Sequence, residues 1–282
     1  MYLREFDPWK SELCTCPSKY SLNPYTGCSH GCVYCYASSY IKNFFKCRTK
    51  PGLIEKLKRE IKRIHQDSLI SLSNTSDPYP PMEANLGITR QCLEIFGKHY
   101  MRVLIITKSS LVCRDRDILK NIKSAVTITV TTLKFADKLE PFAPPPLERF
   151  KSLEELSKAG IPTGLRLDPI IPLLNEEEIE SILKMAKDCG IGHVTFSSFK
   201  PRLDSWQRLK RVFPDLSRKI EPMYFKEGTK KSNAWYLKDE VRKSIILSAR
   251  QICDSLSLTF SSCREGFYEL NSASSCDGSH LI

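Results

Sequence analysis

The chain has 282 residues, of which 41% are hydrophobic and 27% charged, so it can bury a sizeable core and is not globally disordered. Its formal net charge of +11 favours an anionic partner, with nucleic acid the first candidate, although a basic enzyme surface is the alternative. Apolar runs such as 103–106 are far shorter than the roughly 20 residues of a membrane span. The first ten residues lack the apolar core of a secretory signal. Together these features predict a cytoplasmic protein with no membrane partner.

Helical and β-rich segments alternate along the chain. Apolar periodicity predicts helices over 53–65, 89–97, 114–122, 147–159, 175–189, 206–212 and 239–256, with Asn175 capping the fifth. Strands are predicted over 69–72, 101–107, 125–131, 163–167 and 193–196. Such alternation requires parallel strands, and it predicts a partial (β/α)6 TIM-type barrel. The predicted organisation is an N-terminal extension with a cysteine pair (1–20), a barrel core (21–200) and a basic C-terminal region with a second cysteine pair (201–282).

The first motif, NPYTGCSHGCVYCYA, places Cys28, Cys32 and Cys35 in a C-x3-C-x2-C loop. Three thiolates on one loop can hold three irons of a [4Fe–4S] cluster and leave the fourth iron open to a ligand. Structural zinc is the alternative, but it needs four closed ligands, and His30 lies awkwardly within the same loop. We therefore predict an iron–sulfur cluster.

Polar motifs follow four of the predicted strands in turn: SNTSDPYPPME (73–83), TKSS (107–110), TVTT (129–132) and RLDPIIP (166–172). In parallel barrels the chemistry lies at the carboxyl ends of the strands. These motifs are therefore expected to meet at one rim.

Together these residues resemble a known family. C-x3-C-x2-C at the start of a parallel α/β barrel resembles the radical S-adenosylmethionine (SAM) enzymes, and the surrounding motifs resemble the spore photoproduct lyase branch, often labelled DNA repair photolyases. The resemblance covers about 21–200 and rests on the cysteine motif, TSDPY with Glu83, TKS, LEP with its prolines, and GIPTGLRLDPIIP. It implies SAM bound to the open iron, reductive cleavage to a 5′-deoxyadenosyl radical, and hydrogen abstraction from a substrate. A one-electron reductant such as ferredoxin or flavodoxin is implied as a partner.

The resemblance also implies roles for individual residues. Tyr36, Ser76, Asp77, Lys108 and Thr129 fall where the lyases contact SAM. Tyr34 and Tyr36 flank Cys35 as a tyrosine pair that in the lyases helps to relay the hydrogen atom, and packing around the cluster is the alternative.

Three positions depart from the lyase pattern. Asn74 stands where the lyases carry the cysteine that donates hydrogen to the product radical, and an amide does not readily do so. Clean repair of spore photoproduct is therefore not expected unless another thiol, such as Cys113, approaches. Arg166 and Asp168 either bind a polar substrate group or pair with each other.

Four further cysteines, Cys14, Cys16, Cys263 and Cys276, lie near the two ends of the chain. Because chain ends often lie close together, we predict that these thiols form a second metal centre, either a second [4Fe–4S] cluster or zinc. Incidental thiols or disulfides are the alternative, although disulfides are uncommon in the cytoplasm.

The segment 200–231 carries ten basic and four acidic residues, interleaved with aromatic rings at Trp206, Phe213, Tyr224 and Phe225. Cations beside rings are typical of nucleic-acid binding, and we expect Arg208, Lys210 and Arg211 to contact phosphates. The leading prediction is a radical SAM enzyme acting on a nucleic acid, either in DNA lesion repair or in base modification. The alternatives are a radical SAM enzyme acting on a small molecule or peptide, and a non-catalytic iron–sulfur protein that binds nucleic acid.

Overall fold

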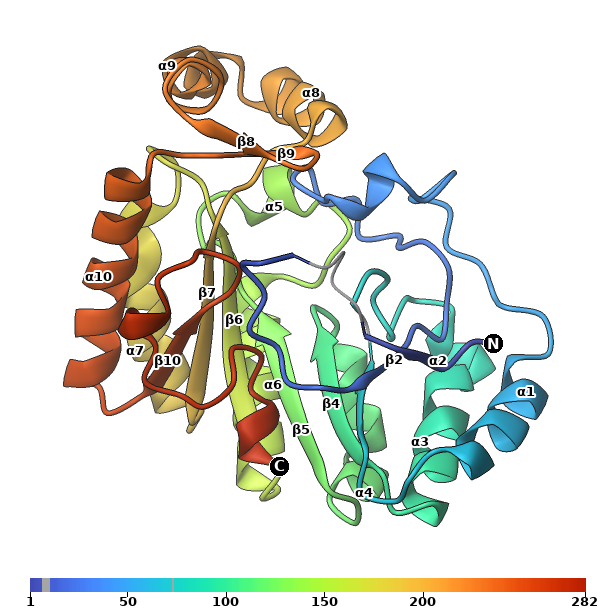
Figure 1. Cartoon of the computed structure of the whole chain (residues 1–282). Helices are drawn as coiled ribbons and strands as arrows, with labels where there is room; N and C mark the ends of the chain where they lie inside the picture. Colours follow the sequence, from blue (N-terminus) through green and yellow to red (C-terminus); the bar gives the residue numbers. More distant parts are fainter. Residues whose placement is uncertain (7–10, 73) are drawn as a thin grey trace.

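The computed structural model describes residues 1–6, 11–72 and 74–282. Its main sheet has eight strands in the order β1-β2-β3-β4-β5-β6-β7-β10 (Figure 1). All neighbours from β2 to β10 are parallel, whereas β1 is antiparallel to β2. The sheet is not closed, which confirms the predicted partial barrel. The strands are β1 (Arg4–Glu5), β2 (Tyr20–Leu22), β3 (Leu69–Leu72), β4 (Arg102–Thr107), β5 (Ser124–Thr129), β6 (Thr163–Ile170), β7 (His193–Ser198) and β10 (Thr259–Ser262).

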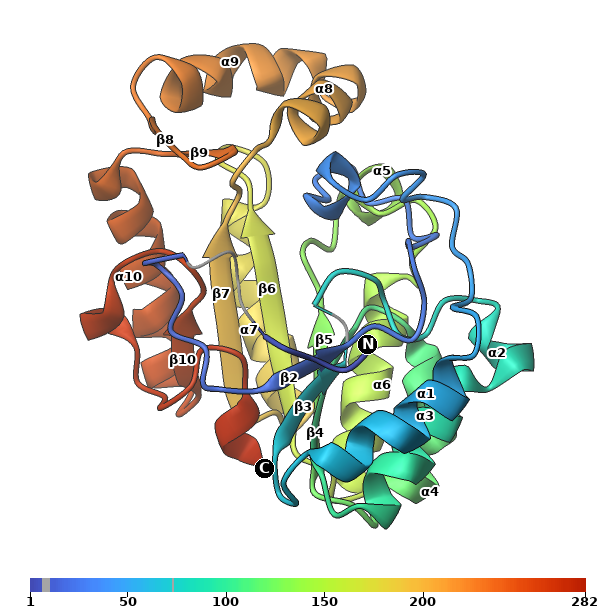
Figure 2. The ribbon, with the colours of Figure 1, turned by 45° about the vertical axis from the view of Figure 1, so that its right-hand side comes forward.

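Helices cover the outer face of this sheet, and a small cap lies over the carboxyl ends of its strands (Figures 1 and 2). The outer helices are α1 (Leu53–Glu60), α2 (Glu83–Leu86), α3 (Ile88–Lys98), α4 (Arg116–Leu119), α6 (Pro146–Lys158), α7 (Ile179–Asp188) and α10 (Asp239–Ser255). Near the carboxyl ends lie α5 (Ala136–Leu139) and the cap, made of α8 (Leu203–Val212), α9 (Pro214–Phe225) and the hairpin β8 (Thr229–Lys231) and β9 (Ala234–Tyr236). Within the described ranges, no helix is long and apolar enough to cross a membrane.

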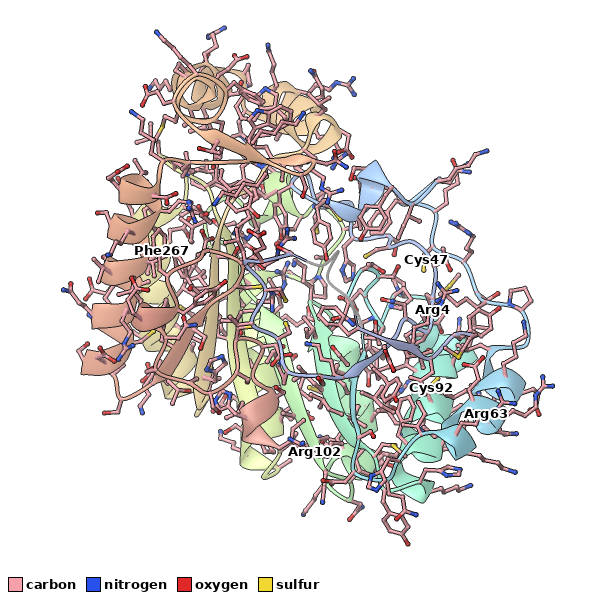
Figure 3. The ribbon with its side chains drawn as sticks, in the orientation of Figure 1. Arg4, Cys47, Arg63, Cys92, Arg102 and Phe267 are labelled. Carbon is pink, nitrogen blue, oxygen red and sulfur yellow. The ribbon has the colours of Figure 1, made fainter. Side chains whose placement is uncertain are left out.

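Strands β3, β5 and β7 are buried at every position, whereas β4 and β6 each keep two partly exposed residues. Val126 and Ile128 of β5 pack into the main core, whereas Ala125 packs with Leu69, Leu104 and the end of the chain. This alternation follows the two-residue period of a strand. Arg102 holds the C-terminal segment by donating to the carbonyls of Ser279 and Ile282, and Figure 3 shows it at that end of the molecule.

Most predicted elements are present with shifted ends. The strand predicted over 163–167 extends to Ile170, because a register shift between Leu167 and Ile170 accommodates Pro169, and bulges tolerate proline. The helix predicted over 114–122 is instead a 3-10 helix (Ser110–Asp115) followed by the single turn of α4. The sequence reading missed α9 and β10. Strand β10, although it lies within 201–282, completes the main sheet.

Asn175 stands at the N-cap position of the 3-10 helix Glu176–Glu178, as predicted, but its side chain makes no capping hydrogen bond. Its buried side chain accepts from the backbone nitrogen of Ile171 at 2.7 Å and donates to the carbonyls of Thr131 and Pro169 at 2.8 and 3.1 Å. The side chain therefore ties together the segments that follow β5 and β6, close to the rim where the polar motifs meet.

Candidate functional site

A cavity of about 760 Å³ lies at the carboxyl ends of the strands, below the cap. It brings together most of the residues that the sequence singled out, from segments far apart in the chain. The lining includes Cys28, Cys32, Cys35, Tyr34, Tyr36, Asn74, Asp77, Lys108, Thr129, Arg166, Asp168, Cys14, Cys16 and Cys263. Ser76 and Cys276 are the predicted site residues outside this lining; both are buried.

The conformation of the cysteine loop depends on Gly27. Its φ is +79°, and a Cβ at this position would lie 2.4 Å from the carbonyl oxygen of Phe44, a contact that only glycine avoids. The next residue, Cys28, donates its backbone N–H to the same carbonyl at 2.8 Å. The loop is therefore held against the segment around Phe44, with three thiols facing one cavity.

The donor set fits the predicted cluster. Burial raises the pKa of Cys32 to about 12, with Lys108 opposing the shift, so the thiol needs the positive charge of a metal to ionise. Among the described residues, no three His, Cys, Asp or Glu side chains are grouped to hold a single metal ion. Thiolates of a cubane bind separate irons and need not converge on one point.

Arg208 of α8 fixes the other end of the cysteine loop. Its Nε donates to the carbonyl of Val33 at 3.0 Å, and one terminal nitrogen donates to the carbonyl of Cys35 at 2.7 Å. The other terminal nitrogen pairs with Asp204 at 3.0 Å. Its guanidinium is therefore engaged within the protein, which argues against the phosphate contact predicted from the sequence.

Asp77 joins three segments at the cavity wall. Its carboxylate accepts from the hydroxyl of Thr107 at 2.7 Å and from the backbone nitrogens of Tyr79 and Lys108 at 2.9 and 2.8 Å. His30 lies 3.6 Å from the second carboxylate oxygen. The carboxylate thereby joins the loops after β3 and β4 to each other, beside His30 of the cysteine loop.

Lys108 lies beside a buried anion. Its Nζ is 3.8 Å from Oε1 of Glu140, which also accepts from Tyr34 and pairs with Arg149. Burial alone would raise the pKa of Glu140, but Lys108 and Arg149 hold it below its usual value. A carboxylate with two cations leaves a positive local field at the cavity wall.

The two tyrosines and Asn74 all line the cavity, and Tyr36 contacts Asn74 directly. Tyr34 is tied to Glu140, and its hydroxyl is also 3.1 Å from that of Thr131. Tyr36 donates its hydroxyl to the backbone carbonyl of Asn74 at 2.6 Å. The amide of Asn74 donates to the hydroxyl of Ser21 at 2.6 Å. Cys113 is not in the cavity lining, and its thiol lies 3.7 Å from the carbonyl of Ser152.

Arg166 and Asp168 pair with each other across the bend of β6. The guanidinium donates to one carboxylate oxygen through Nε at 3.1 Å and through a terminal nitrogen at 3.0 Å. The sequence left two possibilities for these residues, binding of a polar substrate group or pairing with each other, and the structure shows the ion pair. Both side chains still line the cavity, so the pair forms part of its wall.

Two aromatic residues at the cavity mouth, Tyr40 and Phe45, were missed from the sequence, and they lie there with the predicted Tyr36. Tyr36, Tyr40 and Phe45 line the cavity with 39, 43 and 39% of their surface exposed. The guanidinium of Arg202 lies 5.9 and 5.5 Å from the ring centres of Tyr36 and Tyr40. The sequence could have indicated these rings, because the run YCYASSYIKNFF (34–45), which overlaps the end of the cysteine motif, is rich in aromatic residues.

The rings of the 200–231 segment have a different role from the one expected. Trp206 and Tyr224 are buried, and the ring of Phe225 packs 4.9 Å from those of Trp206 and Trp235. These rings form the core of the cap, so the expectation that they stack on bases was wrong for Trp206 and Tyr224. The exposed basic residues of the segment include Lys210 and Arg211 of α8.

The four terminal cysteines lie together, beside the same cavity. The sulfurs of Cys16 and Cys276 are 3.5 Å apart, although 260 residues separate them in the chain. Cys14 lies within hydrogen-bonding reach of Cys16, and Cys263 within reach of Cys276. Next to them Lys19 and Asp277 form a buried ion pair.

A comparison with protein families matches residues 22–186 to the radical SAM superfamily. An uncharacterised protein of Methanocaldococcus jannaschii is 35% identical over 167 residues, which are 57% of this chain and 64% of that protein. An uncharacterised protein of Acidianus two-tailed virus is 31% identical over 198 residues, 62% of this chain and 65% of that protein. The matches thus span a little under two thirds of the length of these relatives.

A similar fold is found in spore photoproduct lyase. The structure of a mutant lyase with bound AdoMet and dinucleoside spore photoproduct superposes with a TM-score of 0.69 at 17% identity, covering 90% of this chain and 79% of the lyase. At this identity the likeness concerns the fold.

Proposed function

Since the chain belongs to the radical SAM superfamily, we propose that Cys28, Cys32 and Cys35 hold its [4Fe–4S] cluster and that the cavity beside them binds SAM and part of a nucleic acid. When bound, these cofactors supply a 5′-deoxyadenosyl radical, which abstracts a hydrogen atom from the substrate. The electron comes from a one-electron carrier such as ferredoxin or flavodoxin. The reaction is lesion reversal or base modification, in the cytoplasm.

The protein's part is to bind and orient the reactants. Lys108, held beside buried Glu140, offers a cation to the carboxylate of SAM. Asp77 joins the loops after β3 and β4, and Ser76 and Thr129 provide hydroxyls nearby. Tyr34 and Tyr36 line the cavity on either side of Cys35 in the sequence, where they are suited to pass a hydrogen atom. The Arg166–Asp168 pair provides a polar wall for the substrate.

The observation that supports a nucleic acid is the chemistry of the cavity and its mouth. The described lining contains eight basic and four acidic side chains, which favours an anion. At the mouth, Tyr36, Tyr40 and Phe45 present half-exposed rings beside Arg202. Rings and guanidinium groups stack on bases, while the surrounding cations attract phosphates. A small apolar substrate would need neither feature.

The test is anaerobic incubation of the reconstituted protein with SAM, dithionite and either cellular DNA or tRNA, followed by nucleoside mass spectrometry. We expect 5′-deoxyadenosine together with an altered nucleoside in one of the two pools. The variant with Cys28, Cys32 and Cys35 changed to Ala should yield neither. If SAM is cleaved but both pools are unchanged, a small molecule or peptide becomes the substrate. If SAM is not cleaved, the protein is a non-catalytic binder.

Variants at the mouth test the binding mode separately. Tyr40→Ala with Phe45→Ala should weaken binding of single-stranded DNA or RNA, since each stacked base contributes about 1–3 kcal/mol. Tyr100→Ala is the matched control, because Tyr100 is 71% exposed but precedes β4, at the amino end of the sheet. If the two variants bound the nucleic acid with equal affinity, the residues at the cavity mouth would not be part of the nucleic-acid interface.

A further inference from the structure

Two segments from opposite ends of the chain meet at the cavity, and each brings two thiols. In space the cysteines follow one another in the order Cys14, Cys16, Cys276, Cys263, with each thiol within hydrogen-bonding reach of the next. The sulfurs of Cys16 and Cys276 are 3.5 Å apart. Four reduced thiols packed together have no role in the SAM site described above.

The backbone around the C-terminal pair is firmly held. The N–H of Cys263 donates to the carbonyl of Phe196 in β7 at 2.8 Å, and the carbonyl of Cys276 accepts from the hydroxyl of Thr195 at 2.9 Å. Both cysteines are therefore fixed to one strand. Their side chains face the N-terminal segment, where Lys19 forms a buried ion pair with Asp277. The backbone hydrogen bonds to β7 therefore hold the two cysteines in place without any contribution from their thiols.

We propose that Cys14, Cys16, Cys263 and Cys276 form a second metal centre with four thiolate ligands. The site joins the N-terminal segment to the segment after β10, beside the cavity. Two ion pairs stand next to it, Lys19–Asp277 and Arg166–Asp168, and each brings its cation close to one of the thiols, Lys19 to Cys16 and Arg166 to Cys263. The centre does not depend on which substrate the cavity binds.

The spacing of the sulfurs favours one ion over a second cubane. With zinc–sulfur bonds of about 2.3 Å, two thiolates in a tetrahedral site lie about 3.8 Å apart, close to the spacing of Cys16 and Cys276. Ligands of a cubane bind different irons and stand farther apart. The four thiols do not yet surround one point, so rotation of their side chains completes the site. Zinc, bound through four sulfurs, is the ion we assign.

Metal analysis of the full chain, purified anaerobically with its cluster reconstituted, tests the assignment. We expect about four irons and one zinc per chain. The double variant Cys263→Ser/Cys276→Ser should lose the zinc, keep the irons and melt at a lower temperature. The control Cys113→Ser/Cys189→Ser, which changes two partly buried cysteines outside both sites, should keep both metals. About eight irons per chain would overturn zinc in favour of a cubane, and four irons without a second metal would overturn the centre.

A measurement on the unaltered protein covers the case in which the double variant does not fold. Alkylation followed by peptide mass spectrometry should find the four thiols protected until a zinc chelator is added, whereas the partly buried thiol of Cys189 should react equally before and after. Alkylation of the four thiols at a rate that the chelator does not change would overturn the proposal. A Cys16–Cys276 disulfide in the anaerobic protein would do the same.

Discussion

The hydroxyl of Tyr36 donates to the backbone carbonyl of Asn74 at 2.6 Å, and this bond joins the residue after the third cluster cysteine to the loop after β3. Because both residues line the cavity, position 74 faces the place where substrate chemistry is proposed. The side chain of Asn74 is held between the hydroxyls of Ser21 and Ser71, at 2.6 and 3.2 Å. A side chain introduced at this position would therefore lie at the cavity wall.

Position 74 decides whether a hydrogen atom can be returned to a product radical. We expect the unaltered protein to release little thymine from 5-thyminyl-5,6-dihydrothymine, because an amide is a poor hydrogen-atom donor. Asn74→Cys should raise the yield by at least about tenfold, which corresponds to about 1.4 kcal/mol in barrier height. Thymine is measured by chromatography, and Asn74→Ser is the control for the polar change alone. Abundant thymine from the unaltered protein would point to a different donor.

Gly27 should be needed for cluster assembly. Gly27→Ala would place a Cβ 2.4 Å from the carbonyl oxygen of Phe44, so the loop must shift, and we expect most of the bound iron to be lost. Gly52→Ala is a matched control, since Gly52 also has a positive φ, of +63°, but open space around its Cβ. The control should cost only the backbone strain, about 1–2 kcal/mol. Iron content and melting temperature separate the two, and equal iron in both variants would contradict the prediction.

The exposed basic residues of α8 should contact nucleic acid. Reversing Lys210 and Arg211 to Glu should weaken binding to many sequences and flatten the salt dependence, as lost phosphate contacts do. The control reverses Lys62 and Arg63, which are equally exposed; Figure 3 shows Arg63 at the opposite end of the molecule from the cap. Affinity is measured by fluorescence anisotropy at several salt concentrations. A similar loss of affinity in both variants would show that the effect comes from the net charge of the protein and not from contacts of α8.

Lys50 gives stability a distinct pH dependence. Burial, with Arg4 nearby, lowers the pKa of Lys50 from 10.5 to about 8. Between these values the unfolded chain binds more protons than the folded one, so the free energy of unfolding should rise as pH increases from about 8 to 10.5. Lys50→Met should lack this rise and be more stable than the unaltered protein at pH 7. Urea unfolding at several pH values checks both, and parallel pH profiles would disprove the assignment.

The fold was largely predictable because its core strands and outer helices carry strong periodic patterns. The predicted strand 69–72 coincides with β3, and the predicted helix 239–256 differs from α10 by one residue. The sequence did not reveal α9, which has Pro222 in its interior and so departs from an ordinary helix pattern. It also did not reveal β10, whose four residues form a strand only beside β7.

The site was predictable where the chemistry is local and not where it depends on tertiary contacts. The cysteine spacing predicts a cluster loop by itself, and the cysteines at both chain ends suggested the proximity that the structure shows. By contrast, nothing in the sequence indicates that Arg208 is turned inward or that Trp206 is buried. The sequence of the 200–231 segment suggests a basic, aromatic surface, but Trp206 and Tyr224 are buried in the cap and Arg208 binds the cysteine loop.

Because Arg208 holds the carbonyls of Val33 and Cys35, the cap and the cysteine loop are thermodynamically linked. Any ligand whose affinity depends on the position of α8 also acts on the loop that carries the cluster ligands. Such coupling is reciprocal, so assembly of the cluster must change the affinity of that ligand by the same factor. Binding constants measured on cluster-free protein would therefore differ from those of the complete enzyme, and the ratio between them measures the coupling free energy.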